Sequence, residues 1–117
     1  MSKILVVTSE EIAGKTIKQH LGLVRGNTIR ARHVGKDILA GLRNIVGGEI
    51  HEYTKLMAES REQAIDRMMD EARSLGANAI ISVRFSTSMI SQGAAELLAF
   101  GTAVRYEDQE YPTDNTL

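Results

Sequence analysis

The chain has 117 residues, no cysteine and a formal net charge of −1. With 43% hydrophobic and 25% charged residues, it has the composition of a single folded globular domain, long enough to bury roughly two-thirds of the surface that its unfolded chain exposes. The lack of cysteine excludes disulfides, thiolate metal sites and cysteine nucleophiles, and the small net charge gives no general reason to expect a nucleic-acid partner.

The first third of the chain predicts extended structure. Residues 4–8 are rich in β-branched side chains, which is typical of a buried strand, and residues 9–16 form a polar connection. Residues 17–34 read mostly as a strand, in which Gly22 and Gly26 indicate bulges or a bend, with a turn at Gly26-Asn27 as an alternative. The run at 4–8 is too short for a signal-peptide core and no later run approaches membrane-spanning length, so we expect a cytoplasmic protein.

Two helices are predicted in the middle of the chain. Apolar residues recur at helical spacing over residues 38–46, with Asp37 as the N-cap and Gly47-Gly48 as the end. A long amphipathic helix follows over residues 53–75, and Gly76 provides its left-handed C-cap.

The start of the long helix has two interpretations. Thr54 can serve as the N-cap, or Ser60 with Gln63 can form a capping box. The earlier start is preferred, because Met57 already belongs to the apolar face. The opposite face is a charge stripe, formed by Glu52, Lys55, Glu59, Glu62, Asp66, Asp70 and Arg73.

The last third predicts two strands and a tail. Residues 79–89 alternate apolar and polar side chains, which predicts one face in the core and one in solvent, and residues 91–93 form a turn. Residues 95–106 are apolar on both faces: Leu97, Ala99 and Ala103 on one, Leu98, Phe100 and Val104 on the other. Such a strand needs two covers, so we predict that the helices supply one and a second subunit the other. Residues 1–106 are therefore predicted to form one domain, and residues 107–117 an acidic, mobile tail.

Four segments of the chain form a recognisable pattern: Asp37-Ile38-Leu39-Ala40-Gly41-Leu42-Arg43-Asn44-Ile45-Val46-Gly47-Gly48, Leu75-Gly76-Ala77-Asn78-Ala79, Gly14-Lys15-Thr16-Ile17 and Gly101-Thr102-Ala103-Val104. Together they resemble the YbjQ-like family. The resemblance implies an α+β fold assembled into a ring of identical subunits, a pentamer, and it carries the description "putative heavy-metal-binding" without a set of catalytic residues. Together with the periodicities, it predicts a mainly antiparallel sheet with a short and a long helix packed on one face, assembled as a ring-like homo-oligomer.

The metal description can be compared with the ligands that the chain offers. Soft metals favour thiolate, thioether and imidazole ligands, and none of the three histidines forms a spaced pair with another. Glu49, His51 and Glu52 follow the Gly47-Gly48 pair and are the local candidates for a divalent or heavy-metal ion. Adjacent His51 and Glu52 point apart on any regular helix or strand, so ligation there needs an irregular loop or ligands repeated around a ring axis. The stripe carboxylates are a candidate for Ca²⁺, against a solvated helix face.

Positive charge gathers in a second candidate region, the basic segment (residues 15–36). It contains Lys15, Lys18, Arg25, Arg30, Arg32 and Lys36, and no acid. Such a segment suits anionic partners, nucleic acid included, but also a solvated strand or a surface that meets acidic residues of another subunit. Residues 9–16, which overlap the start of this segment, end in Gly14-Lys15-Thr16 as a phosphate-binding loop does. Glu10 and Glu11 stand where phosphates would lie, so we expect a turn into the next strand instead.

The motifs that the sequence contains and lacks indicate what kind of function to expect. The chain has no nucleophile elbow, no paired histidine-and-acid signature and no dinucleotide glycine fingerprint, so an enzyme is not favoured. Phe85 and Phe100 are expected either to stack on nucleic-acid bases or to pack under a helix or in an interface. We therefore predict a non-catalytic oligomeric domain that binds a small ligand or a metal ion at subunit interfaces. The alternative is a binder of anionic partners through the basic segment.

Overall fold

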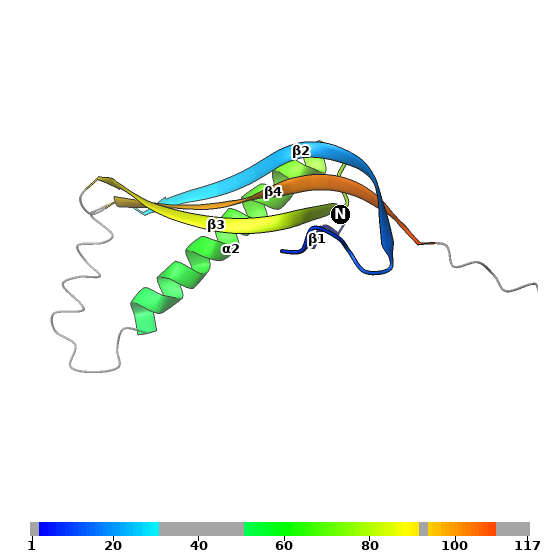
Figure 1. Ribbon diagram of the computed structural model, residues 1–117. Coiled ribbons are helices and arrows are strands. Elements are labelled where there is room, and N and C mark those ends of the chain that lie inside the picture. Colours follow the sequence, from blue (N-terminus) through cyan, green and yellow to red (C-terminus); the bar gives the residue numbers. More distant parts are fainter. Residues whose placement is uncertain (1–2, 31–50, 92–93, 110–117) are drawn as a thin grey trace, which may run out of the picture.

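The computed structural model describes residues 3–30, 51–91 and 94–109, which form an α+β domain (Figure 1). Within this part of the chain there are four strands and one helix: β1 (Leu5–Val6), β2 (Lys15–Arg30), α2 (His51–Ser74), β3 (Ala79–Ser91) and β4 (Ala94–Asp108). The strands make one mixed sheet in the order β1-β3-β4-β2. Only the β1–β3 pairing is parallel, so the predicted α+β class and mainly antiparallel sheet are confirmed for these residues.

Several predicted boundaries change. The strand predicted over residues 4–8 shrinks to Leu5–Val6 at one edge of the sheet. β4 runs on to Asp108, so the first two residues of the predicted tail pair with β2. The short helix predicted over residues 38–46 and the remainder of the tail from residue 110 lie outside the described residues. The described part of the chain has no helix long and apolar enough to cross a membrane.

Gly26 is the point at which α2 crosses β2. The turn predicted at Gly26-Asn27 is wrong, because β2 continues through both residues in register with β4. A Cβ atom on Gly26 would lie 2.1 Å from the Ala64 carbonyl oxygen and 2.4 Å from the Met68 nitrogen. The helix backbone therefore lies directly on the strand, which only glycine permits. The predicted irregularity occurs earlier, where the β2–β4 register shifts before Gly22, whose φ is +117°.

The two ends of α2 test the predicted start of the helix and its predicted C-cap. The helix runs from His51, so it already includes the earlier of the two predicted starts, but Thr54 lies inside it and is not its N-cap. Ser60 is inside the helix and only 1% exposed, and its interpretation as an N-cap is wrong. At the other end Gly76 (φ +83°) donates its N–H to the Arg73 carbonyl and Ala77 donates to the Ala72 carbonyl, both at 3.0 Å. These paired bonds form the predicted left-handed C-cap.

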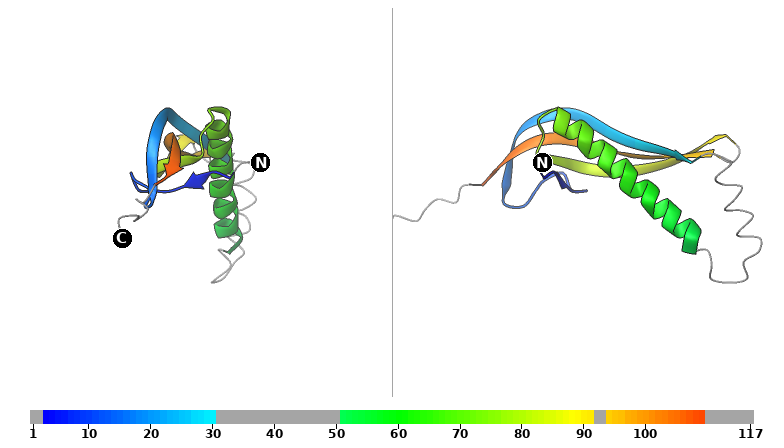
Figure 2. Two further views of the ribbon diagram at one scale, coloured as in Figure 1. Left: turned by 90° about the vertical axis from the view of Figure 1, so that its right-hand side faces the viewer. Right: turned by 180° about the vertical axis from the view of Figure 1, so that it is seen from behind.

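Small side chains let α2 lie close to the sheet. On the face of the sheet that α2 covers (the helix face), Ala64, Met68 and Ala72 pack on Val24, Ala99 and Ala103 in the main core. Met68 is completely buried, and removing its side chain from water contributes about 2 kcal/mol. Seen from behind, α2 runs obliquely across the strands and its first turns stand away from the sheet (Figure 2, right).

The opposite face of the sheet (the far face) has a smaller core near β1. Ala79, Ile81 and Val104 are buried there, and Val7 and Ile12 pack on them. The prediction that β4 is apolar on both faces is therefore confirmed. At this end, however, the second cover over Val104 comes from the chain's own β1–β2 segment, and no second subunit is needed for it.

A bulge at Ser82 changes which residues of β3 face the helix. Ile81 pairs with Thr102 and Arg84 pairs with Phe100, so Ser82 and Val83 together oppose a single residue of β4. Ser82 has a φ of +56°. Because of the extra residue, Val83 lies in the helix-face core whereas Ile81 lies in the far-face core. The prediction that residues 79–89 keep one apolar face throughout is wrong for this reason.

Beyond the bulge, β3 leaves the core. We call its residues 84–89 the distal arm, and every side chain in it is exposed. Phe85 is 46% exposed and Met89 is 73% exposed. Both pair with β4 residues on the helix face, Phe85 with Ala99 and Met89 with Ala95. The start of α2 diverges from this end of the sheet (Figure 1), and both side chains stay exposed.

Candidate binding surfaces

The metal candidates lie at the start of α2. His51 and Glu52 are its first two residues, whereas Glu49 lies outside the described residues, as do the side chains of His51 and Glu52. The backbone of His51 and Glu52 is helical, and ligation through an irregular loop or around a ring axis stays a prediction.

The carboxylate stripe of α2 is a solvated face. Glu59, Glu62, Asp66 and Asp70 are all exposed, and Arg73 donates to Asp70 at 2.8 Å in a pair that is also partly solvated. Within the described ranges, no three histidine or carboxylate side chains come close enough together to hold a metal ion. The residues described here therefore do not fit a resident heavy metal within one subunit.

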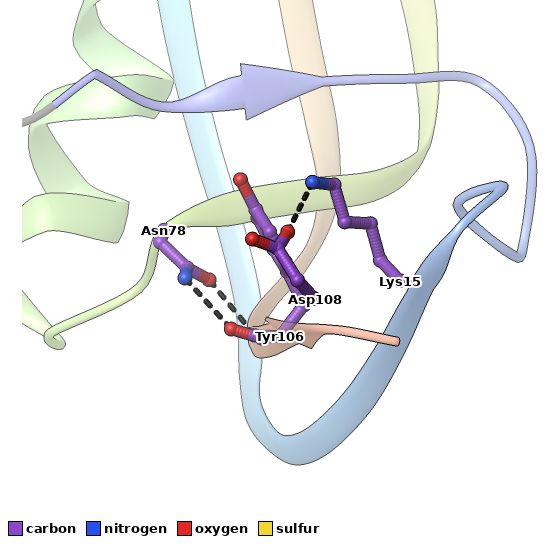
Figure 3. Close-up of polar contacts among 4 residues, drawn as sticks. All are labelled: Lys15, Asn78, Tyr106 and Asp108. Atoms are coloured by element: carbon purple, nitrogen blue, oxygen red, sulfur yellow. Dashed lines mark hydrogen bonds and ion pairs between the residues drawn. The ribbon is translucent and has the colours of Figure 1, made fainter. Parts of the chain in front are cut away.

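The basic segment is divided by the fold. Lys15 forms an ion pair with Asp108 and its ammonium lies 5.3 Å from the centre of the Tyr106 ring, so it closes the end of the sheet (Figure 3). Lys18 and Arg25 are exposed on β2. The side chain of Arg30 and the whole of Arg32 and Lys36 lie outside the described residues. Gly14, with a φ of +75°, turns the chain into β2 as predicted, and Lys15 donates its N–H to the Ile12 carbonyl in that turn.

Beside this ion pair, Asn78 joins the α2–β3 connection to β4. Its side-chain amide donates to the Tyr106 carbonyl at 3.0 Å and accepts from the Tyr106 N–H at 2.9 Å, as Figure 3 shows. The Asn78 side chain thus imitates a strand residue and satisfies both backbone groups of Tyr106. Its role is structural, because both polar atoms of the amide bond to the backbone of Tyr106.

A different cluster lies on the far face of the sheet. Phe100, on the central strand β4, pairs with Arg25 of β2 on one side and with Arg84 of β3 on the other. Directly paired residues of neighbouring strands project from the same face, so the three side chains form one row across three strands. Both arginines are exposed and Phe100 is partly exposed. We call this set the Arg-Phe-Arg row.

Sequence reasoning missed this row. It grouped Phe85 with Phe100, but Phe85 pairs with Ala99 and therefore lies on the helix face. It also assigned Arg25 to a basic segment along one strand rather than to a row across three strands. The row depends on the β3–β4 register after the Ser82 bulge, and a single sequence carries no direct signal of that register.

Comparisons with known proteins agree with this fold. The family model described as "Putative heavy-metal-binding" (YbjQ) matches residues 4–107. A UPF0145 protein from Dehalococcoides mccartyi is 60% identical over 104 residues, which is 89% of this chain and all of that protein. UPF0145 proteins from Archaeoglobus fulgidus (56% identity; 88% of this chain, 95% of that protein) and Thermus thermophilus (54%; 90% and 92%) are also similar.

A solved structure that shares the fold is also similar. It is a protein of unknown function from Pediococcus pentosaceus, assigned to the DUF74 family, with a TM-score of 0.57 at 16% identity over 89% of this chain and 98% of that one. At that identity the likeness supports the fold alone. The match of the family model over nearly the whole chain, together with relatives of more than 50% identity, places this chain in the YbjQ-like family of UPF0145 proteins.

Proposed function

We propose that the chain is a non-catalytic, homo-oligomeric binding domain that holds a small ligand or a metal ion where its subunits meet. The observation that supports assembly is the distal arm. Six consecutive residues of a strand, 84–89, are exposed on both faces, and they include Phe85 and Met89. A strand gains little from folding unless one face is covered, and exposed aromatic and thioether side chains on one face are typical of an interface.

The expected partner is a second copy of the chain. On the sheet, the helix face of the distal arm presents Phe85 and Met89; on α2, Met57 and Ile65 are only half-buried. Each copy thus carries an uncovered apolar arm and an incompletely covered helix. An arm that packs on the next copy's helix is a heterologous contact, and such contacts close into rings when the rotation permits. Five subunits is the ring size that the family resemblance implies.

A metal ion, in this proposal, is bound by ligands from more than one subunit. His51 is the imidazole residue at the start of α2. Equivalent His51 residues from several copies can converge only around a ring axis. Imidazole ligands suit Zn²⁺, which is therefore the ion to test first.

Assembly is tested by native mass spectrometry of the full, untagged chain purified without chelator. We expect a closed oligomer of the 12.8 kDa subunit, and we expect Phe85→Asp with Met89→Asp to convert it to monomer. Leu75→Asp is the matched control, because Leu75 is exposed to the same degree (44% against 46% for Phe85) at the other end of the molecule. A monomeric wild-type protein, or an oligomer that survives both arm substitutions, would overturn the proposed interface.

Metal binding is tested separately. Zn²⁺ added to the assembled wild-type protein should bind in fewer than one equivalent per subunit, and His51→Ala should abolish that binding without changing the oligomer. Retention of Zn²⁺ by the His51→Ala protein would remove His51 from the site. Zn²⁺ binding by the monomeric arm variant would show that a single subunit is sufficient.

A further inference from the structure

The far face of the sheet has a composition that a solvated face does not need. Besides the Arg-Phe-Arg row, it exposes Leu23 (62%) and Ile29 (54%) on β2, on the same side of the strand as Arg25. The next row toward the distal end pairs Asn27, Leu98 and Ser86. These two rows and their neighbours therefore combine the Phe100 ring, two guanidinium groups, exposed aliphatic side chains and short polar side chains.

In this row the two arginines flank Phe100. Neighbouring strands lie about 4.8 Å apart, so the Cα atoms of Arg25 and Arg84 are roughly 10 Å apart, with Phe100 between them. A planar group stacked on Phe100 would therefore have one arginine on its β2 side and one on its β3 side. A base in a single strand of nucleic acid meets this arrangement, because it has a π-face to stack and a phosphate on either side.

Arg84 is already oriented. Its Nη1 atom donates to the Thr8 carbonyl and to the Val83 carbonyl, both at 2.8 Å. These bonds fix the guanidinium at the β1 side of the row, while the residue stays exposed. Since a guanidinium has five N–H donors, the fixed group keeps donors for a phosphate and loses less entropy when it binds one.

From this row we infer that the far face binds single-stranded nucleic acid, with a base stacked on Phe100 and the adjoining phosphates on Arg25 and Arg84. This binding is independent of the proposed assembly, because Phe85 and Met89 lie on the opposite face of the sheet. It also differs from binding along the basic segment, since Lys15 is engaged with Asp108 and β3 supplies half of the charge.

Glu96 is a carboxylate on this face that would repel a bound nucleic acid. Glu96 pairs with Ile29 and Ser88, two rows from Phe100, and accepts from the Asn27 amide at 2.9 Å. The hydrogen bond neutralises no charge, so a phosphate passing this row is repelled. Glu96→Gln should therefore strengthen binding by about 2-fold to 5-fold at low salt, and less as salt is added.

The test is fluorescence anisotropy with a labelled poly-U oligonucleotide of roughly 10 nucleotides, titrated with the full chain between about 50 mM and 200 mM salt. Phe100→Leu, which keeps a large apolar side chain but removes the ring, should weaken binding by about 10-fold. Arg25→Gln and Arg84→Gln should each lower the slope of log affinity against log salt by about 0.7. Arg61→Gln, an exposed arginine on α2, is the matched control and should change neither quantity.

The inference would be overturned by no binding at the lowest salt, by equal binding to duplex and single strand, or by an effect of Arg61→Gln as large as that of Arg25→Gln. Binding of uridine monophosphate as tight as that of the oligonucleotide would also overturn it, because one nucleotide then satisfies the site. Thermal melts of each variant confirm that folding is retained. Failure of this site leaves the proposed assembly untouched, since native mass spectrometry tests that alone.

Discussion

At position 26 the absence of a side chain decides how closely two layers of the fold approach. Gly26 has two helix backbone atoms within 2.4 Å of where its Cβ would lie, and backbone atoms cannot move without moving α2. Asn78 acts in the opposite way, because a specific side chain replaces backbone pairing at Tyr106. Both residues act on stability, and neither touches the proposed binding surfaces.

Gly26→Ala should lower the free energy of unfolding by about 3 kcal/mol, since the helix must lift from the strand to admit one methyl group. Urea denaturation at fixed protein concentration measures the change. Leu23→Ala, on the same strand but 62% exposed, is the control and should cost far less. A Gly26→Ala protein as stable as the control would mean that α2 does not rest on this residue.

Asn78→Ala should cost about 1–3 kcal/mol, because the N–H and carbonyl of Tyr106 lose their partners in a half-buried site. Asn27→Ala removes an exposed amide that bonds only to a solvated carboxylate and should change stability by less than about 0.5 kcal/mol. The same denaturation experiment compares them. Equal effects would show that the Asn78 bonds are not formed in solution.

At the scale of elements, sequence periodicity predicted the long helix and its glycine cap well, because both depend on neighbours three to five residues apart. It also predicted that β4 is apolar on both faces, as Ala103 and Val104 confirm. It failed where a partner element decides the outcome. Gly26 resembles a turn residue until α2 is placed over it, and the alternation of β3 is misleading until the pairing with β4 reveals the bulge at Ser82.

Ser82→Val tests that bulge. A β-branched residue is strained at a φ of +56°, so the substitution should cost about 1–2 kcal/mol, whereas Ser82→Gly should be neutral or stabilising. Hydrogen exchange provides a second measurement. The amides of Ser82 and Val83, which donate to the Ser9 and Val7 carbonyls, should lose protection in the valine variant alone.

At the scale of the whole molecule, the sheet separates two surfaces. The helix face of the distal arm carries Phe85 and Met89, and the far face carries the Arg-Phe-Arg row. In this proposal a subunit uses one face for its own copies and the other for a ligand. Two functions on opposite faces of one sheet change independently, because substitutions far apart without shared partners have additive effects.

This separation predicts that assembly and oligonucleotide binding can each be lost without the other. The arm variant with Phe85→Asp and Met89→Asp should be monomeric, yet it should bind a short poly-U oligonucleotide within about 2-fold of the wild type. Phe100→Leu should show the reverse, with the wild-type mass in native mass spectrometry and weakened binding. An oligonucleotide of roughly 6 nucleotides is used, so that it reaches a single subunit. Loss of both properties in either variant would mean that assembly builds the ligand site.

The bulge at Ser82 has a consequence for aligning relatives of this protein. Because Ser82 and Val83 share one partner position on β4, a sequence that lacks one residue there still places its equivalents of Val83 and Phe85 toward α2 and that of Arg84 away from it. A one-residue gap placed elsewhere in β3 exchanges the two sets and moves the arginine under the helix. An alignment that shifts this gap by a few positions therefore assigns the equivalent of Arg84 to the helix face instead of the far face, although the protein itself is unchanged.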